Sequence, residues 1–428
     1  MPKQQFMQQI KKQTKIVSKT TVRKCPDCNG SGKQYKVKKD GSPYKIQPMC
    51  KHCIGTGYVY DATKDVAGFK FTPTHVQQVM SHGFATDKNT LAGLAVIAKQ
   101  HELEVAHQFL TNMQRINALD TYINSFCKGI RKNVINGILH PQVSQVRTGT
   151  GRLSSSNPNF QNLPRGGTAT VRKAVVSRFP GGKILEADFG QLEFRIAVWM
   201  SNDATGRKEI DEGFDVHAYT SKVLTEAGQK TSRQDAKART FRPLYGGVKG
   251  SAAEMEYNKS FMKKYSGIAT WHTALQEEVM LHKKITTVTG RQFAFPEVKR
   301  LRNGVTEATK IKNYPVQSGA TADLVPLSCV LYNNITKSMK LKSKFINTVH
   351  DSIVLDIHPD ELDIVPKLIY QAMMGVAPAM DKMFDINLDV PMEVELKIGD
   401  DWFDMTEIDV DKLTNLDITD NNIDRRIA

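Results

Sequence analysis

The most informative segment of this 428-residue chain reads Lys183-Ile-Leu-Glu-Ala-Asp188-Phe-Gly190-Gln-Leu-Glu-Phe-Arg-Ile-Ala-Val-Trp199. Its β-rich start predicts a strand over 183–187, and the run after Gly190 opens a helix. A carboxylate that follows a strand and precedes a glycine and a helix is held rigidly and stays open to substrate. Asp188 is therefore a candidate metal ligand, although aspartate near glycine is also typical of a plain turn or cap.

A second carboxylate occurs at 345–356, where the chain reads Phe-Ile-Asn-Thr-Val-His350-Asp351-Ser352-Ile-Val-Leu-Asp. Two β-rich runs around a polar His-Asp-Ser predict a tight hairpin with Asp351 at its tip. Such a group could share a metal ion with Asp188. Taken alone, it would be only a turn residue.

A helical stripe of charged and aromatic residues is predicted between the two carboxylates. Arg233, Lys237, Phe241 and Tyr245 recur at intervals of four, which places them on one slowly drifting face of a helix. Two cations followed by two aromatic rings suit a triphosphate followed by a base. The alternative, a solvated basic face, would not need aromatic residues in register with the charges.

The stretch 147–167 is rich in Gly, Ser, Asn and Pro. A structureless segment of this length inside a domain is usually functional. Its small polar residues around Arg152 suit contact with a sugar–phosphate backbone. Residues 71–146, which precede it, have the apolar spacing of helices.

Four of the six cysteines form two close pairs, Cys25 with Cys28 and Cys50 with Cys53, each within a CxxCxGxG repeat. Thiolates at this spacing predict one tetrahedral Zn²⁺ site in a reducing compartment, with free or redox-active thiols as the alternative. The glycines let the backbone turn under the metal, where a Cβ would obstruct it. The repeat resembles the zinc-binding segment of DnaJ-type chaperones, but it covers only residues 25–57, which favours a zinc module and not a chaperone.

The composition is that of an ordinary globular protein, with 40% hydrophobic and 24% charged residues and no apolar run long enough for a transmembrane helix. Residues 1–60 carry thirteen Lys/Arg and two Asp, a formal +11 of the total +15, whereas residues 403–428 carry a formal −4. A concentrated basic arm usually meets a polyanion such as DNA or RNA, although it could also only aid solubility. The isolated Cys127 and Cys329 are expected to be buried core thiols.

Taken in order, these segments resemble family A DNA polymerases over about residues 70–402. Residues 150–164 look like the template–primer contact segment, and three further segments look like motifs A, B and C: Asp188–Arg195, Arg233–Gly246 and Val349–Asp351. Smaller matches fall in the same order at Asp215-Val-His217, Thr289-Gly-Arg291, Asn313-Tyr-Pro-Val-Gln317, Val390-Pro-Met-Glu-Val and Trp402.

The resemblance implies an α+β right-hand polymerase, with a thumb, a palm built on an antiparallel sheet and helical fingers, preceded by a small zinc module. The implied divisions are a basic arm 1–24, the zinc-binding module 25–60, the thumb 65–146, the palm 147–205 and 331–402, the fingers 206–330 and an acidic C-terminal tail 403–428.

The resemblance also implies template-directed addition of dNTPs to a primer 3′-hydroxyl. Asp188 and Asp351 would be the catalytic carboxylates and, with the backbone carbonyl of Phe189, would hold two Mg²⁺ ions. The implied dNTP-binding residues are Gln191, Glu193, His217, Arg233, Lys237, Phe241 and Tyr245, with Glu193 excluding a ribose 2′-hydroxyl. The implied DNA-binding residues are Arg152, Asn157, Gln161, Arg291, Asn313, Gln317 and His350.

Four features depart from the family pattern. Ser352 stands where the family usually has Glu, which leaves two aspartates as the essential carboxylates. Pro243 lies within the motif B helix and would break a backbone bond near Arg239, and Arg242 replaces the family's glycine. The chain before the thumb is too short for an exonuclease domain, so proofreading would come from another polypeptide, as in the polymerase half of a split enzyme for phage DNA replication.

Two other functions stay open. A single-subunit RNA polymerase also has Ser at the position of Ser352, but Glu193 and Phe241 favour deoxynucleotides. A non-catalytic, zinc-containing DNA-binding subunit should have lost active-site residues, and none is missing. The expected partners are primer–template DNA, dNTPs and a separate exonuclease subunit or processivity factor. No association with a membrane is expected. The expected location is the cytoplasm, that of the host cell if the protein is phage-encoded.

Overall fold

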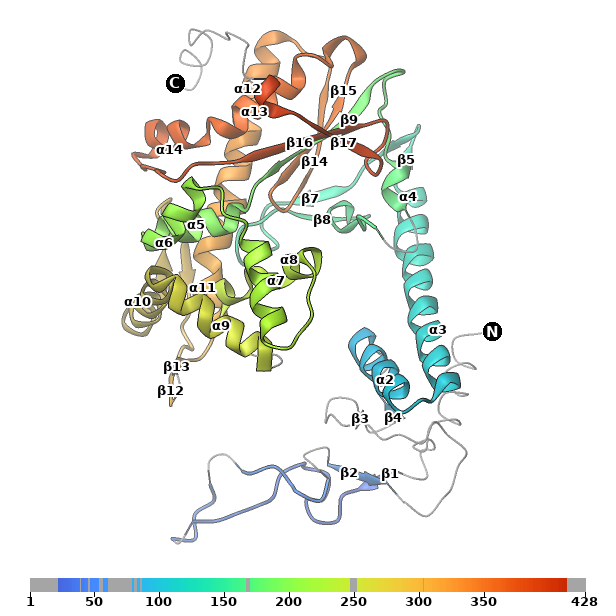
Figure 1. Ribbon diagram of the computed structural model, residues 1–428, viewed down its shortest axis with the longest axis vertical. Helices are drawn as coiled ribbons and strands as arrows, with labels where there is room; N and C mark the ends of the chain where they lie inside the picture. Colours follow the sequence, from blue (N-terminus) through green and yellow to red (C-terminus); the bar gives the residue numbers. More distant parts are fainter. Residues whose placement is uncertain are drawn as a thin grey trace. The chain divides into compact units, whose positions relative to one another are not determined.

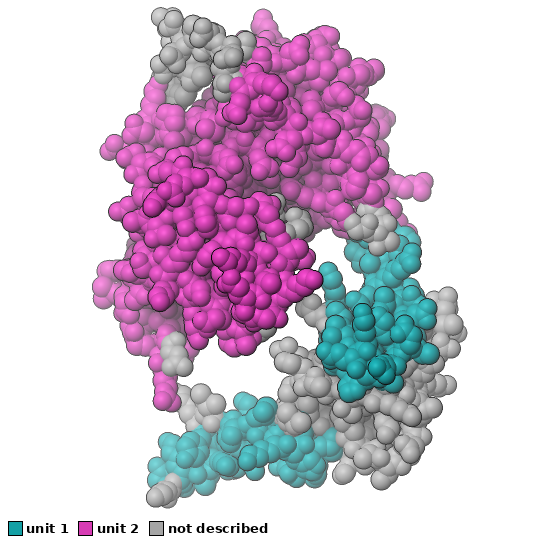
Figure 2. All heavy atoms as spheres, viewed as in Figure 1, with its two compact units in different colours: residues 1–125 teal, residues 126–428 magenta. Residues whose placement is uncertain are grey.

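The structure is a computed structural model that describes residues 22–38, 40–44, 47–53, 57–60, 79–80, 83–84, 87–166, 170–246, 252–302 and 304–413. It divides into two compact units, residues 1–125 and 126–428, which Figure 2 shows in different colours. Most of the predicted basic arm and the last part of the predicted acidic tail lie outside the described residues. Within the described part, no helix is both long enough and apolar enough to cross a bilayer.

The first unit combines a cysteine-rich module with a helical hairpin. β1 (Val22–Lys24) pairs antiparallel with β2 (Tyr58–Tyr60), and β3 (Val79–Met80) pairs with β4 (Gly83–Phe84). The two helices of the hairpin are α2 (Lys88–Gln100) and α3 (Glu104–Thr121). They pack through buried residues spaced three or four apart, namely Leu91, Leu94, Ala95, Ala98, Ala106, Leu110 and Met113.

After α3, the chain continues as a π-helix (Tyr122–Cys127) and α4 (Lys128–Lys132). Two small ladders follow, β5 (Val134–Ile135) with β6 (Ile138–Leu139) and β7 (Gln142–Ser144) with β8 (Ser154–Ser156). The 3₁₀ turns η3 (Phe160–Asn162) and η4 (Val171–Ala174) lead to the main sheet. The predicted helical character of 71–146 is therefore confirmed only between residues 88 and 132.

The second unit is built on an antiparallel sheet of five strands in the order β14–β15–β9–β16–β17 (Figure 1). The strands are β9 (Lys183–Phe189), β14 (Lys344–Val349), β15 (Ser352–Ile357), β16 (Val394–Gly399) and β17 (Met405–Ile408). Both faces of the central β9 are covered. Leu185 and Ala187 lie in the main core with α12 (Val325–Met339), α13 (Val365–Met374) and α14 (Val376–Phe384), whereas Ile184 packs with Phe160 and Trp402.

The chain between β9 and β14 is mainly helical. Its helices are α5 (Leu192–Ser201), α6 (Ala204–Asp211), α7 (Val216–Glu226), α8 (Arg233–Thr240), α9 (Ala252–Lys264), α10 (Ser266–His282) and α11 (Ala308–Gln317), followed by a π-helix (Ser318–Leu324). Two short hairpins, β10 (Lys284–Thr286) with β11 (Gln292–Ala294) and β12 (Arg300–Leu301) with β13 (Gly304–Val305), join α10 to α11. Two apolar clusters, around Phe261 and around Val279, hold this region together.

The structure confirms the strand predicted at 183–187 and the hairpin predicted at 345–356. The prediction that 147–167 is structureless is wrong, because β8 finds a partner in β7 outside that stretch. The single helical stripe through Tyr245 is also wrong: α8 ends at Thr240 and a 3₁₀ turn, η5 (Arg242–Tyr245), follows. Pro243 explains the change, because it has no N–H with which to continue the helix.

Contrary to expectation, the two isolated cysteines are not buried. Cys127 is exposed and Cys329 is half-buried.

Candidate active site

The two predicted carboxylates meet at one end of the sheet. Asp188 lies at the penultimate position of β9, and Asp351 occupies the two-residue turn between β14 and β15. His350 adopts the left-handed conformation that this turn requires, with φ of 57°. Because Ser352 stands directly opposite Asp188 in the β15–β9 register, Asp351 is brought beside Asp188. The N–H of Phe189 donates to the carbonyl of Asp351 at 3.3 Å and fixes this arrangement.

The electrostatics of the pair suit a bound cation. Burial and the negative charge of Asp351 raise the pKa of Asp188 to about 8, and burial also raises the pKa of Asp351. The buried Oδ1 of Asp188 has no hydrogen-bond partner among the described residues. Arg165 lies 4.0 Å from Asp188 and is already paired with Glu186 at 2.7 Å. Two crowded acids with one unpaired oxygen fit a divalent ion, whose charge would favour their ionised form.

The third carboxylate usual in the family is missing, as the sequence predicts. Ser352 is fully buried, and its hydroxyl donates to the carbonyl of Val349 at 3.0 Å. In the described part of the chain, only the cysteine module brings three or more His, Cys, Asp or Glu donor atoms within 4.8 Å of one another. Glu395 on β16 lies opposite Asp188 in register and faces the same cavity, a position that no sequence motif indicated.

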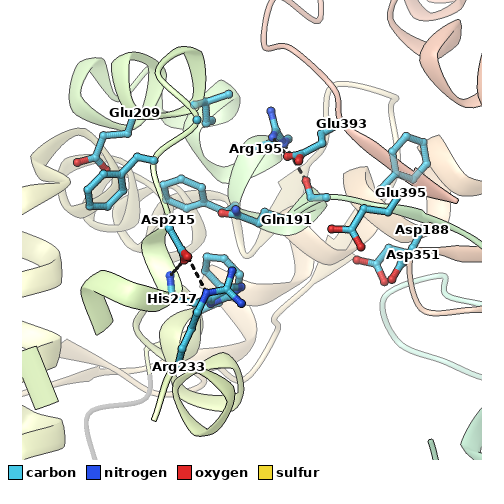
Figure 3. A pocket seen from close by; sticks show the side chains of 17 residues that line it. Asp188, Gln191, Arg195, Glu209, Asp215, His217, Arg233, Asp351, Glu393 and Glu395 are labelled. Atoms are coloured by element: carbon cyan, nitrogen blue, oxygen red, sulfur yellow. Dashed lines mark hydrogen bonds and ion pairs between the residues drawn. The ribbon is translucent and has the colours of Figure 1, made fainter. Parts of the chain in front are cut away.

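A cavity of about 510 Å³ extends from the acidic pair toward α7 and α8 (Figure 3). It brings together seven of the predicted residues: Asp188, Phe189, Gln191, His217, Arg233, Phe241 and Asp351. Lys237 lies on α8, one turn after Arg233, but its side chain lies outside the described part. The cavity therefore has Asp188, Asp351 and Glu395 at one end, and Arg233 with Asp215 at the other.

Phe241 is fixed by its aromatic neighbours. Its ring stacks on Phe194 with centroids 5.6 Å apart and meets the edge of His217 at 5.4 Å. His217 in turn hydrogen-bonds through Nδ1 to the hydroxyl of Thr240 at 2.9 Å. These contacts hold this wall of the cavity in place, even though α8 stops before Phe241.

A second, smaller cavity of about 210 Å³ contains predicted DNA-binding residues, namely Arg152, Gln161 and His350. Arg152 forms an ion pair with Glu193 and donates through Nε to Thr321 at 2.6 Å. Burial raises the pKa of Glu193 against the opposing effect of Arg152. Arg152, a predicted DNA-binding residue, thus also orients Glu193.

The remaining predicted residues line neither cavity. They are Glu193, Tyr245, Asn157, Arg291, Asn313 and Gln317. Asn157 donates to Gln142 at 3.0 Å, and Arg291 lies 3.4 Å from Asp323. The oxygens Tyr245 Oη and Asn313 Oδ1 are buried without a hydrogen-bond partner among the described residues.

The cysteine module forms a closed sulfur cluster. The Sγ atoms of Cys25 and Cys50 are 3.8 Å apart, those of Cys28 and Cys53 are 3.6 Å apart, and all four sulfurs lie within 4.8 Å of one another. Gly57 leaves no room for a side chain, because a Cβ there would lie 2.3 Å from the carbonyl oxygen of Gly30; the predicted turn under a metal ion stays a prediction.

The sequence belongs to DNA polymerase family A, which it matches over residues 49–404. It is 28% identical to DNA polymerase I of Aquifex aeolicus (strain VF5) over 296 residues, which are 64% of this chain and 48% of that protein. It is also 28% identical to the thermostable DNA polymerase I of Thermus aquaticus over 339 residues, 75% of this chain and 39% of that protein. The chain thus spans between about a third and a half of the length of such relatives.

A solved structure shows the same fold. The structure described as the POL domain of Pol1 from M. smegmatis in complex with DNA primer-template and dNTP superposes with a TM-score of 0.62 at 24% identity. The match covers 76% of this chain and 57% of that one. The predicted α+β polymerase fold is therefore confirmed, whereas the predicted domain boundaries stay predictions.

Proposed function

We propose that this chain is a template-directed DNA polymerase that adds dNTPs to the 3′-hydroxyl of a primer. The observation that carries the proposal is the meeting of Asp188 and Asp351 at one end of a cavity whose other end holds Arg233 and His217. Membership of DNA polymerase family A supports the same activity.

Asp188, Asp351 and the backbone carbonyl of Phe189 would hold two Mg²⁺ ions, which supply charge neutralisation and a more acidic primer hydroxyl when bound. Arg233, Lys237 and His217 would bind the triphosphate and orient it in line with the attacking oxygen. Gln191, Phe241 and Tyr245 would contact the incoming nucleotide. The predicted primer–template residues are Arg152, Asn157, Gln161, Arg291, Asn313, Gln317 and His350.

Glu193 supports the choice of deoxynucleotides over ribonucleotides. Its ion pair with Arg152 holds a carboxylate in place near the acidic pair, since the charge of Asp351 contributes to its raised pKa. A fixed, partly desolvated carboxylate would leave no room for a ribose 2′-hydroxyl and would cost free energy to displace.

The test is extension of a primer–template by the purified chain with Mg²⁺ and either dNTPs or rNTPs. We expect efficient extension with dNTPs only, and a loss of at least about a hundredfold in Asp188→Asn, because a metal site contributes several kcal/mol to the transition state. Glu407→Gln, an exposed acid on β17 outside the cavity, is the matched control. Unchanged extension by Asp188→Asn, or efficient use of rNTPs, would contradict the proposal.

We further propose that the sulfurs of Cys25, Cys28, Cys50 and Cys53 hold one structural Zn²⁺. Four buried sulfurs this close together, without disulfides, have the donor number and geometry of a closed zinc site. Elemental analysis should find one zinc per chain and less in Cys50→Ser, and a zinc-free, fully folded protein would contradict this.

A role in phage DNA replication, with a separate exonuclease subunit or processivity factor, stays a prediction from the sequence.

A further inference from the structure

Asp215 joins two of the residues that we assign to the triphosphate (Figure 3). It precedes α7, and its Oδ1 accepts the backbone N–H groups of His217 at 3.0 Å and of Ala218 at 2.9 Å. Its Oδ2 accepts the Nε–H of Arg233, on α8, at 2.6 Å. One carboxylate therefore fixes the start of the helix that carries His217 and also the side chain of Arg233.

Arg233 has little else to hold it. Its side chain is 55% exposed, and among the described residues it forms its hydrogen bond and ion pair with Asp215 alone. A free arginine side chain loses substantial rotamer entropy when a ligand fixes it. If the side chain is already oriented, that loss is not incurred again when the ligand binds.

The geometry leaves the phosphate-binding part of Arg233 available. A guanidinium has five N–H donors, and Asp215 uses only the one on Nε. The two Nη groups, which form the fork that phosphates prefer, are not engaged by Asp215. The carboxylate thus anchors the side chain at its base without taking the donors that a triphosphate would use.

The helices that carry these residues are coupled at a second point. His217 bonds to Thr240 at the end of α8, and the hydroxyl of Ser221 on α7 donates at 2.6 Å to the carbonyl of Thr231, just before α8. Asp215 lies at the edge of this packed pair, where it lines the cavity with Arg233 and His217.

We propose that Asp215 is a positioning residue that orients Arg233 and His217 toward the triphosphate before the nucleotide binds. The inference rests on the proposed function of this cavity. A carboxylate close to a triphosphate would by itself repel it. The ion pair with Arg233 offsets that repulsion, so that the net effect of Asp215 is to strengthen nucleotide binding.

The first variant to test is Asp215→Asn. Asparagine caps helices about as well as aspartate, so the start of α7 is retained while the charged bond to Arg233 is weakened. We expect the KM for dNTPs and the equilibrium Kd for a dNTP on a dideoxy-terminated primer to rise about threefold to fivefold, the range for a partly exposed ion pair. Turnover and primer–template affinity should change less than twofold. Asp211→Asn removes the same charge from an exposed position at the end of α6 and should leave the dNTP KM and Kd unchanged.

A double-mutant cycle separates positioning from a merely structural role. If Asp215 acts through Arg233, adding Asp215→Asn to the Arg233→Ala variant should raise the dNTP Kd less than twofold further. Additive effects, an unchanged or lowered Kd in Asp215→Asn, or an equal loss of DNA affinity would overturn the inference. A wild-type chain that binds dNTPs but does not extend primers would contradict the proposed function and still leave the cycle measurable.

Discussion

His272 should make the helical region between β9 and β14 sensitive to acid. It lies on α10 with only 2% of its surface exposed. Burial, together with the charge of Lys312, lowers its pKa from 6.5 to about 3. The folded protein therefore keeps this ring neutral at pH values where the unfolded chain protonates it.

The sign and size of the effect follow from proton linkage. Below pH 6.5 the unfolded state binds a proton that the folded state does not bind until about pH 3. The free energy of unfolding thus falls as the pH falls, by about 1.4 kcal/mol for each pH unit in this window. Between pH 7 and pH 5 His272 alone should remove about 2 kcal/mol, which is a large share of the stability of a typical domain.

The assay is urea unfolding at pH 7 and pH 5, followed by tryptophan fluorescence. Trp271 is a suitable reporter, because its ring centroid lies 5.6 Å from that of His272. The wild type should lose about 2 kcal/mol more than His272→Leu over this interval. The comparison holds whether leucine raises or lowers stability at pH 7, since only the difference between the two pH values is used.

His282→Leu, at an exposed position at the end of the same helix, is the control and should behave like the wild type. Equal losses in the wild type and His272→Leu would refute the reasoning.

Three further outcomes are expected. Phe241→Tyr should improve incorporation of dideoxynucleotides about fivefold in a competition assay. The tyrosine hydroxyl beside the sugar would replace the hydrogen bond, worth about 1 kcal/mol, that is lost with the 3′-hydroxyl. An unchanged ratio would mean that Phe241 is not beside the sugar. Lys237→Ala should reduce turnover more than tenfold, because the lost contact is with the triphosphate. Primer–template affinity, measured by fluorescence anisotropy, should change less than threefold. An equal loss of turnover and DNA affinity would indicate that Lys237 contacts DNA. Deleting residues 1–60 should flatten the dependence of DNA affinity on salt, because fewer counterions are released on binding, and equal slopes would argue against DNA contact by that segment.

The sequence was sufficient where a local pattern carries the information. The β-rich run before Asp188 and the two runs around Asp351 became β9, β14 and β15, because alternation and a short polar turn are local properties. Each CxxC turn likewise places two sulfurs together locally, whereas the closest sulfur pairs, Cys25 with Cys50 and Cys28 with Cys53, join the two turns.

The sequence was insufficient where a partner is distant or a single residue interrupts a pattern. The four-residue spacing predicted Tyr245 on the same helix as Arg233. Because Pro243 cannot continue that helix, Tyr245 lies in a 3₁₀ turn instead. The strand at Ser154–Ser156 has no apolar alternation and forms because Gln142–Ser144 lies beside it. Likewise, Asp215 looked like part of a small motif, and only the structure shows that its second oxygen reaches another helix.

The acidic pair and the core depend on one register. In β9 the odd positions Leu185, Ala187 and Phe189 enter the main core, so Glu186 and Asp188 must lie on the opposite face. The neighbouring strands repeat the rule, which is why Ser352 and Glu395 flank Asp188 on that face. A slip of one residue would turn Asp188 into the apolar core and expose Ala187, at a cost in both burial and desolvation. Core packing therefore excludes pairings of β15 with β9 that are displaced by one residue, and the observed pairing places Ser352 opposite Asp188 and Asp351 beside it.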